Sequence, residues 1–424
     1  MSRNTKTYIF YGLGTNFWSR LEKRKEILDY VMAFMDSDSE TWGRHYFDIE
    51  VLPPDKVKEI DYEKIVITSN AYFNEIKKDL MEKYSVNEER IQYIEEFIAE
   101  RVMNADFLPD RVRLEACSTC QLDCRACYMR ANNYGGVGNG YLKYENFKNF
   151  VDSNPQMQRI ELSNNGEIFL NPDIQKIIEY AWLKGIQLTA WNGVNLNNVS
   201  DEVLETLVRC EFRGMVVSLD GTKQDTYAYY RRNGNYDKVI ENIKRINYYK
   251  YRYNKKLPEL KWQLVVMNHN ELEVQKAKFL AYELDMGICF KQTWESGFVP
   301  EHPDMLLRET GIDFRRKDAV DEFYDPVIFG NYVCRQMYWE PQINWDGRLL
   351  GCCANFRYDF GINVFEVGLK EALRDSKYMA AKKMLMNQCA DGVDIADIPC
   401  SKCEYFDAIR KCGNYICAGD IVIY

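Results

Sequence analysis

The stretch Cys117-Ser-Thr-Cys-Gln-Leu-Asp-Cys-Arg-Ala-Cys-Tyr128 decides how the rest of the chain is interpreted. Cys120, Cys124 and Cys127 follow an apolar segment that we predict to be a strand, so their thiolates would lie on the loop after it. Three thiolates at this spacing can bind three corners of one iron–sulfur cube, whereas a cluster that only carries electrons needs four. One iron is therefore left open, and an open metal position is where a cofactor or substrate can bind.

This C-x3-C-x2-C loop resembles that of the radical S-adenosylmethionine (SAM) enzymes. In that family the open iron binds the amino and carboxylate groups of SAM. The reduced cluster then cleaves SAM to a 5′-deoxyadenosyl radical, which takes a hydrogen atom from the substrate. The resemblance runs from near Arg111 onward. It implies a SAM-binding [4Fe–4S] cluster, SAM as cofactor and a reductant such as flavodoxin or ferredoxin.

The composition narrows the class of protein. The chain has 424 residues, of which 46% are hydrophobic and 28% charged, and its net charge is -9. This balance is typical of a globular protein and argues against a nucleic-acid partner, which would favour a basic excess. No apolar run reaches the roughly 18 residues that a membrane helix needs. We therefore expect a cytoplasmic protein without a membrane segment. Its 14 cysteines should then be reduced thiols, and eight of them lie at or after Cys334, which favours metal ligation.

The predicted fold class is α/β with three domains. Residues 1–100 alternate strands and helices and predict a Rossmann-like domain. Its first strand ends at Gly12-Leu-Gly14, and Asp36 ends the second, as in a nucleotide site, but Phe17 stands where the third glycine belongs. A plain turn without ligand is equally compatible. A helix is predicted from Val86 to Leu108, with Ser85 and Glu88 as its capping box.

Residues 108–310 predict a partial (β/α)6 TIM barrel, the fold that radical SAM enzymes use, and residues 330–424 predict a small cysteine-rich domain. In such barrels the site lies at the C-terminal ends of the strands. Gln263, Lys291 and Gln292 on the later strands are expected to line a substrate pocket. The six predicted barrel strands are Arg111–Ala116, Gln158–Ser163, Ile186–Ala190, Gly214–Leu219, Lys261–Met267 and Ile288–Gln292.

Several strand ends carry residues that the resemblance assigns to SAM. Asn165, Gly166 and Glu167 match the family's Gly-Gly-Glu turn, which holds the SAM amino group, with Asn165 in place of the first glycine. Asn192 could contact adenosine or substrate, and Ser218 would reach the SAM ribose or carboxylate. Of two adjacent arginines, Arg232 rather than Arg231 is expected to pair with the SAM carboxylate. No catalytic residue is assigned.

The tail resembles the SPASM, or twitch-type, extension of radical SAM enzymes. Asp346-Gly347 predicts a hairpin turn between two strands. Four thiolates would close an auxiliary [4Fe–4S] cluster, and a structural zinc is the alternative occupant. Cys353 is the fallback for Cys352. One auxiliary cluster is expected. A second remains an alternative, because the tail has three further cysteines, Cys389, Cys412 and Cys417. The four expected ligands are Cys334, Cys352, Cys400 and Cys403.

The function that the resemblance implies is a SAM-dependent radical reaction. The expected outcome is oxidation or epimerisation of a small molecule, such as a sugar, nucleotide-sugar or amino-acid derivative. One alternative is maturation of a ribosomal peptide precursor, and another is an iron–sulfur scaffold or electron carrier without SAM chemistry. The sequence leaves open whether SAM is consumed and how many copies of the chain assemble.

Overall fold

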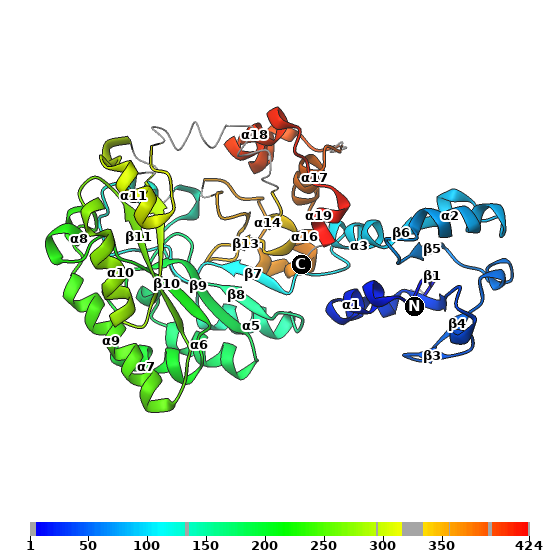
Figure 1. Ribbon diagram of the computed structural model, residues 1–424, viewed down its shortest axis with the longest axis horizontal. Helices are drawn as coiled ribbons and strands as arrows, with labels where there is room; N and C mark the ends of the chain where they lie inside the picture. The colour runs from blue at the N-terminus through cyan, green and yellow to red at the C-terminus, as the bar shows by residue number, and fades with distance from the viewer. Residues whose placement is uncertain are drawn as a thin grey trace. The chain divides into compact units, whose positions relative to one another are not determined.

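The computed structural model describes residues 6–131, 135–293, 296–315, 334–355, 357–388 and 392–422. The chain forms two units (Figure 1). Unit 1 contains Met1–Phe107 and Cys417–Tyr424, and unit 2 contains Leu108–Ile416. The chain therefore leaves unit 1 after Phe107 and returns to it at Cys417. The predicted domain start at residue 330 lies outside the described residues.

Unit 1 is built on a six-stranded sheet in the order β3-β4-β2-β1-β5-β6. All neighbouring strands are parallel except β3 and β4, so the five parallel strands lie in the order third, second, first, fourth, fifth along the chain. This is the order of a doubly wound sheet. The strands are β1 (Tyr8–Tyr11), β2 (Val31–Met35), β3 (His45–Tyr46), β4 (Ile49–Leu52), β5 (Lys64–Ile67) and β6 (Ile91–Tyr93).

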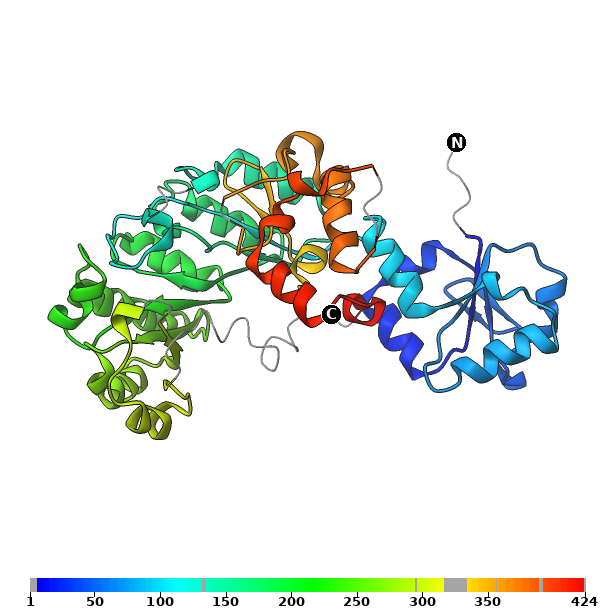
Figure 2. The ribbon, with the colours of Figure 1, turned by 90° about the horizontal axis from the view of Figure 1, so that it is seen from above.

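Helices cover both faces of this sheet, which is why β1 is apolar at every position (Figure 2). Phe10 meets Phe97 of α3 on one face, with ring centres 5.3 Å apart. Ile9 on the other face shares a core with Leu80 of α2. The short α19, from the end of the chain, packs on α3. The helices are α1 (Thr15–Lys23), α2 (Phe73–Glu82), α3 (Ile94–Met103) and α19 (Ala418–Val422).

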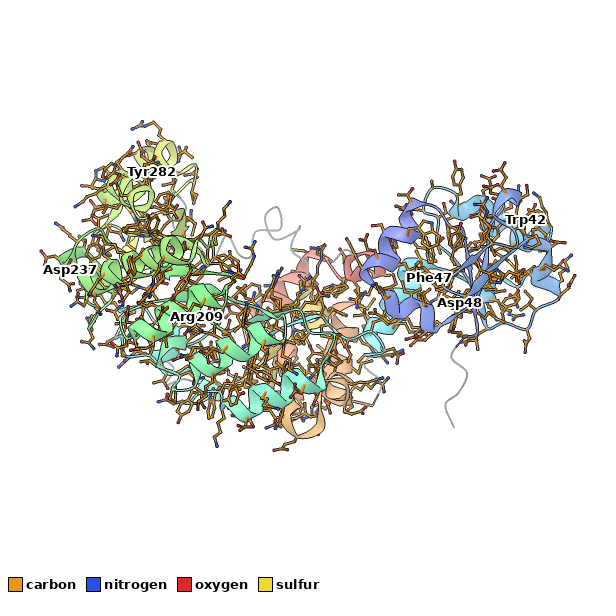
Figure 3. The ribbon with its side chains drawn as sticks, turned by 90° about the horizontal axis from the view of Figure 1, so that it is seen from below. Trp42, Phe47, Asp48, Arg209, Asp237 and Tyr282 are labelled. Carbon is orange, nitrogen blue, oxygen red and sulfur yellow. The ribbon has the colours of Figure 1, made fainter. Side chains whose placement is uncertain are left out.

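Two local features of unit 1 differ from simple expectation. The predicted helix over Val86–Leu108 is wrong in its first part: Ile91–Tyr93 forms strand β6, and α3 begins only at Ile94. The apolar residues of this segment complete the parallel sheet beside β5, so tertiary pairing overrides local helix propensity. The β3–β4 hairpin turns through Phe47 and Asp48, which have left-handed φ values of 52° and 61° (Figure 3).

Unit 2 contains an eight-stranded sheet in the order β12-β11-β10-β9-β8-β7-β13-β14. The first six strands along the chain are parallel and lie in chain order, which confirms the six predicted strands. The carboxyl ends of these strands therefore share one edge. The strands are β7 (Arg111–Leu114), β8 (Arg159–Glu161), β9 (Gln187–Val194), β10 (Gly214–Ser218), β11 (Glu259–Val266), β12 (Gly287–Gln292), β13 (Gln342–Ile343) and β14 (Leu349–Gly351).

Helices follow most strands of unit 2 and pack beside one another along the sheet, as α5 with α6, α6 with α7 and α7 with α9 (Figure 1). Ser200 caps α7 with its side chain, and Asn235 caps α9 in the same way. The helices are α4 (Tyr128–Ala131), α5 (Tyr144–Ser153), α6 (Ile174–Leu183), α7 (Asp201–Arg209), α8 (Gln224–Tyr230), α9 (Tyr236–Tyr253), α10 (Val274–Glu283), α11 (Pro303–Thr310), α14 (Gln336–Trp339), α15 (Val364–Val367), α16 (Leu369–Leu373), α17 (Ser376–Leu385) and α18 (Glu404–Cys412).

The cysteine-rich tail is joined to the strands of unit 2 by its hairpin. β13 pairs in parallel with β7, and β14 pairs antiparallel with β13, which confirms the predicted Asp346-Gly347 turn. Trp345 donates its indole N–H to the Val137 carbonyl at 3.2 Å, and Arg348 donates to the Gly136 carbonyl at 2.6 Å. The hairpin therefore holds the segment that follows the first cysteine loop. Across the described ranges, no helix is both long and apolar enough to span a bilayer.

Candidate functional site

The loop after β7 carries Cys120, Cys124 and Cys127, all of them half-buried. Its backbone is tied to the segment after α8, where the Asp123 N–H donates to the Arg232 carbonyl at 3.0 Å. Burial, together with the nearby Glu167, Cys124 and Cys127, raises the pKa of Cys120 to about 12. A bound metal would offset this cost, because a coordinated thiol gives up its proton.

The three thiols do not converge on one point in this structure. Within the residues that the structure describes, no three histidine, cysteine, aspartate or glutamate side chains surround one point as a mononuclear ion requires. In an iron–sulfur cube each thiolate binds its own iron, so the three thiolates need not surround one point. Three ligands on one loop remain compatible with such a cube.

Gly166 fits against the cysteine loop because it has no side chain. A Cβ at Gly166 would lie 2.2 Å from the Cys117 carbonyl oxygen and 2.7 Å from that of Thr119. The following Glu167 N–H donates to the Thr119 carbonyl at 2.9 Å. The turn after β8 is therefore fixed directly to the loop that carries the three thiols.

Glu167 places a carboxylate next to this loop. Its side chain is 1% exposed, and Oε2 accepts the Asn195 N–H at 2.6 Å. Its Oε1 is buried and makes no hydrogen bond of good geometry among the described residues, although the backbone N–H groups of Phe169 and Leu196 also act on the carboxylate. Burial raises the pKa of Glu167 to about 7, against the hydrogen bonds that lower it. A buried carboxylate oxygen of this kind is a natural partner for an ammonium group, so this position fits the amino group of SAM.

Asn165 uses its side chain, which explains why a glycine is not needed there. Its Nδ2 donates to Glu115 Oε2 at 2.8 Å, and its Oδ1 accepts the Tyr128 hydroxyl at 3.2 Å. Glu115 is fully buried, and burial raises its pKa to about 8. Sequence reasoning missed Glu115. The available signal was an acidic residue directly after a short strand, two residues before the cysteine-rich loop.

Asn192 and Ser218 lie at the ends of β9 and β10. Asn192 is exposed and donates its amide to the Ser163 carbonyl at 2.8 Å. Ser218 is 6% exposed. Between them, Gly193 has φ 121°, and a Cβ there would lie 2.8 Å from Ser218 Oγ. Both predicted side chains therefore lie at the edge of the sheet that also carries the Gly166 turn.

The two arginines differ in direction. Arg231 is mostly buried, donates from Nε to Asp220 at 2.6 Å and places Nη1 3.8 Å from Cys124 Sγ. Arg232, which we favoured from the sequence, has a side chain 47% exposed that reaches Asp123 at 3.7 Å. Both arginines therefore reach the cysteine loop, the buried Arg231 at Cys124 and the half-exposed Arg232 at Asp123.

The predicted pocket residues on the later strands are split by the alternation of side chains. Gln263 is 7% exposed, pairs in register with Ser218, and its Oε1 is buried without a partner in the described part of the chain. Lys291 is exposed. Gln292 donates its amide to the Asp313 carbonyl at 2.5 Å. Gln263 is therefore the member of this group that lies beside the predicted site.

The tail brings its predicted ligands to one cavity of about 360 Å³. Burial, together with the nearby Cys353 and Cys403, raises the pKa of Cys352 to about 12. Tyr128, next to the third thiol of the first loop, lines the same cavity. Cys412 is absent from the described lining, Cys417 belongs to unit 1, and Cys389 lies outside the described residues. The thiols that line the cavity are Cys334, Cys352, Cys353, Cys400 and Cys403.

In unit 1, the Asp36 carboxylate accepts hydrogen bonds from the backbone around it. Its Oδ2 accepts the Leu13 N–H at 2.7 Å, and Oδ1 accepts the Asp38 N–H at 3.0 Å. Both carboxylate oxygens therefore stabilise the backbone between strand and helix. This arrangement matches the plain-turn alternative that the sequence left open.

Comparisons with known proteins give a family model and several solved structures. The model described as "C2185-like, N-terminal" matches residues 5–92. Streptococcus suis SuiB matches at 15% identity over 73% of this chain and 78% of that chain, with a TM-score of 0.49. SuiB bound to S-adenosylmethionine matches at 14% identity over 80% and 82%, with a TM-score of 0.48.

A third solved structure, BtrN in complex with AdoMet and 2-DOIA, matches at 13% identity over 65% of this chain and 87% of that chain, with a TM-score of 0.38. No curated protein matches the sequence. In its cysteine motifs the chain resembles the radical SAM enzymes that carry a SPASM or twitch extension.

Proposed function

We propose that this protein is a radical SAM enzyme with one auxiliary [4Fe–4S] cluster. The observation that carries the proposal is Glu167 Oε1, a buried acceptor that makes no hydrogen bond of good geometry in the described part of the chain, on a turn that is bonded to the three-cysteine loop. A reduced cluster on Cys120, Cys124 and Cys127 would supply the electron for reductive cleavage of SAM.

Each residue of the site has a proposed task. Glu167 receives the SAM ammonium, and Gly166 lets the turn approach the cysteine loop. Ser218 and Asn192 line the edge where the adenosine and ribose would lie. Arg232 keeps its proposed task of pairing with the SAM carboxylate. Arg231, which is held by Asp220, would stabilise the Cys124 thiolate with its guanidinium, whose Nη1 lies 3.8 Å from Sγ.

We assign the tail cavity to the auxiliary cluster. Its five thiols exceed the four that close a [4Fe–4S] cube, with Cys353 as the additional one. The zinc alternative needs four ligands, so the fifth thiol on this cavity does not require a zinc ion. Such a cluster could accept an electron from a substrate radical, which would make a net oxidation possible.

We propose a small-molecule substrate and, as outcome, oxidation or epimerisation. The support is unit 1, whose doubly wound parallel sheet is Rossmann-like in strand order. The alternative, a peptide maturase, would usually carry a winged peptide-recognition domain, which this sheet is not. We further propose a cytoplasmic protein, reduced by flavodoxin or ferredoxin, whose unit 2 strands form a partial TIM barrel.

The test is anaerobic reconstitution, reduction with dithionite and addition of SAM, followed by measurement of 5′-deoxyadenosine and of iron per chain. We expect deoxyadenosine together with about eight irons, four for each of two clusters. A chain with a full iron load that yields no deoxyadenosine would contradict the SAM chemistry and would leave the scaffold alternative.

Two cysteine variants control this test. Cys120→Ala should lose deoxyadenosine and part of the iron. Cys210→Ala removes a buried thiol at the end of α7 and should change neither quantity. Equal losses in both variants would indicate general damage to the fold.

A further inference from the structure

Glu115 is a buried carboxyl group without a role in the proposed chemistry. It is 0% exposed and comes directly after β7, at the start of the segment that leads to the cysteine loop. Its backbone N–H donates to the Ile343 carbonyl of β13 at 3.0 Å, so its position is fixed by the sheet. Burying a carboxyl group is costly, and the cost must be offset by good hydrogen bonds.

The hydrogen bonds of the Glu115 carboxylate go to the Asn164–Asn165 turn. The Asn165 N–H lies 3.2 Å from Oε1 and 3.0 Å from Oε2, and Asn165 Nδ2 lies 2.8 Å from Oε2. Main chain and side chain of one residue thus bind the same carboxylate. Such a double contact fixes both the position of the turn and the orientation of the amide.

The other end of the Asn165 amide is also held. Its Oδ1 accepts the hydroxyl of Tyr128, the residue after Cys127. On the far side of the turn, Gly166 is in close contact with the Cys117 and Thr119 carbonyls. Asn165 is therefore held between the end of β7 and the cysteine loop, two residues before Glu167.

We propose that Glu115 is a positioning residue for SAM: through Asn165 it holds the turn that aims Glu167 at the SAM ammonium. This proposal rests on the proposed function above. A misplacement of a binding group by about 1 Å can cost a large factor in rate, so a fixed turn has value even though Glu115 touches no ligand itself. Tyr128 completes the arrangement and extends it to the tail cavity, which its side chain also lines.

The experiment uses the reconstituted full chain with Glu115→Gln, which removes the charge and replaces one of the two oxygens that face the Asn165 N–H by an amide N–H₂. SAM is titrated against the reduced protein while the electron paramagnetic resonance (EPR) spectrum of the cluster is followed, and KM and kcat for deoxyadenosine formation are measured. We expect unchanged iron content, an unchanged EPR spectrum before SAM is added, and a KM for SAM raised about tenfold.

Glu271→Gln is the matched control. Glu271 is 2% exposed and accepts the backbone N–H groups of Glu301 and His302, each at 2.9 Å, as well as the His302 ring. It is thus a second buried carboxylate in unit 2 that holds a turn, but not the turn next to the cysteines. We expect this variant to keep the parental KM for SAM.

Two further variants separate positioning from general stability. Tyr128→Phe removes only the hydroxyl bond to Asn165 and should raise the KM for SAM by about two- to threefold, even if Glu115→Gln fails to fold. In the Asn165→Gly background, Glu115→Gln should cost less than in the parent, because Glu115 acts through Asn165.

The outcomes distinguish the two proposals. A parent protein whose cluster spectrum does not respond to SAM would overturn the proposed function. A parent that responds, together with Glu115→Gln and Tyr128→Phe variants that respond at the same SAM concentrations, would overturn the positioning role alone. Additive effects of Glu115→Gln and Asn165→Gly would overturn the route through Asn165.

Discussion

Lys382 is a buried charge away from the proposed SAM site. Its side chain lies in α17, is 2% exposed and places Nζ 5.5 Å from the ring centre of Tyr378. Burial lowers the pKa of Lys382 from 10.5 to about 7. Between these two values the unfolded chain binds a proton that the folded chain does not bind. The free energy of unfolding therefore rises with pH across this interval, by at most about 1.4 kcal/mol per pH unit.

Replacing Lys382 by methionine should remove this pH dependence. We expect Lys382→Met to be more stable than the parent near pH 7, by about 1–3 kcal/mol, with the difference shrinking toward pH 10. The measurement is the thermal midpoint of both proteins between pH 7 and pH 10. Lys370→Met, at an exposed position on α16, should follow the parent curve. A constant difference across the whole range would contradict the titration of Lys382.

Residue-level predictions are most direct from the sequence where chemistry alone specifies the residue. The pattern of Cys120, Cys124 and Cys127 needs no structure to be recognised as a three-thiol loop. The choice between Arg231 and Arg232 is harder, because adjacent residues point in different directions and the turn decides which side chain is buried. Glu115 was missed because its partners lie 50 residues away in the chain.

At the scale of elements, the turn after β8 is limited by backbone contact. Gly166→Ala would place a Cβ 2.2 Å from the Cys117 carbonyl, and backbone on that side cannot move without shifting the cysteine loop. We expect this variant to lose stability and to take up fewer irons at the first cluster. Gly14→Ala is the control, since no atom lies within 4 Å of the Cβ that would be added there. Iron per chain and the midpoint of thermal unfolding measure both effects.

The cysteine-rich tail should hold a second group of irons, which can be lost without loss of the first cluster. Cys403 lines the tail cavity, at the end of the segment Pro399–Lys402, whereas Cys412 at the end of α18 does not line it in the described structure. Cys403→Ser should therefore lose up to about four irons while the SAM-responsive EPR signal persists. Cys412→Ser should keep the parental iron content. Equal iron loss in the two variants would point to a second tail cluster.

The strand pattern of both units was predictable because alternating apolar and helical segments specify a parallel sheet locally. The place of the tail strands in the sheet was harder to predict from the sequence. β13 adds to β7 across 229 residues of sequence, and neither strand indicates this partner by its own composition. Likewise, nothing in Ala418–Val422 alone indicates that it packs on α3 of unit 1. Non-local pairing of this kind is decided by burial in the folded chain.

At the scale of the whole molecule, unit 1 depends on both ends of the described chain. Ile421 of α19 is 1% exposed. Removal of residues 417–424 should destabilise unit 1 by about 2 kcal/mol or more, since it uncovers the apolar surface that α3 shares with α19. Hydrogen exchange should accelerate in α3 and β1, while iron content stays at the parental value. Ile395→Ala, at a position 49% exposed, should leave exchange unchanged.

The return of the chain to unit 1 at Cys417 has a consequence for synthesis on the ribosome. Because translation proceeds from the N-terminus, α19 emerges only after every cysteine of the first loop and of the tail cavity has been made. The N-terminal sheet must therefore wait, with one surface of α3 uncovered, while the cysteine-bearing unit 2 folds. The docking of α19 then marks a newly made chain in which all the proposed cluster ligands are present.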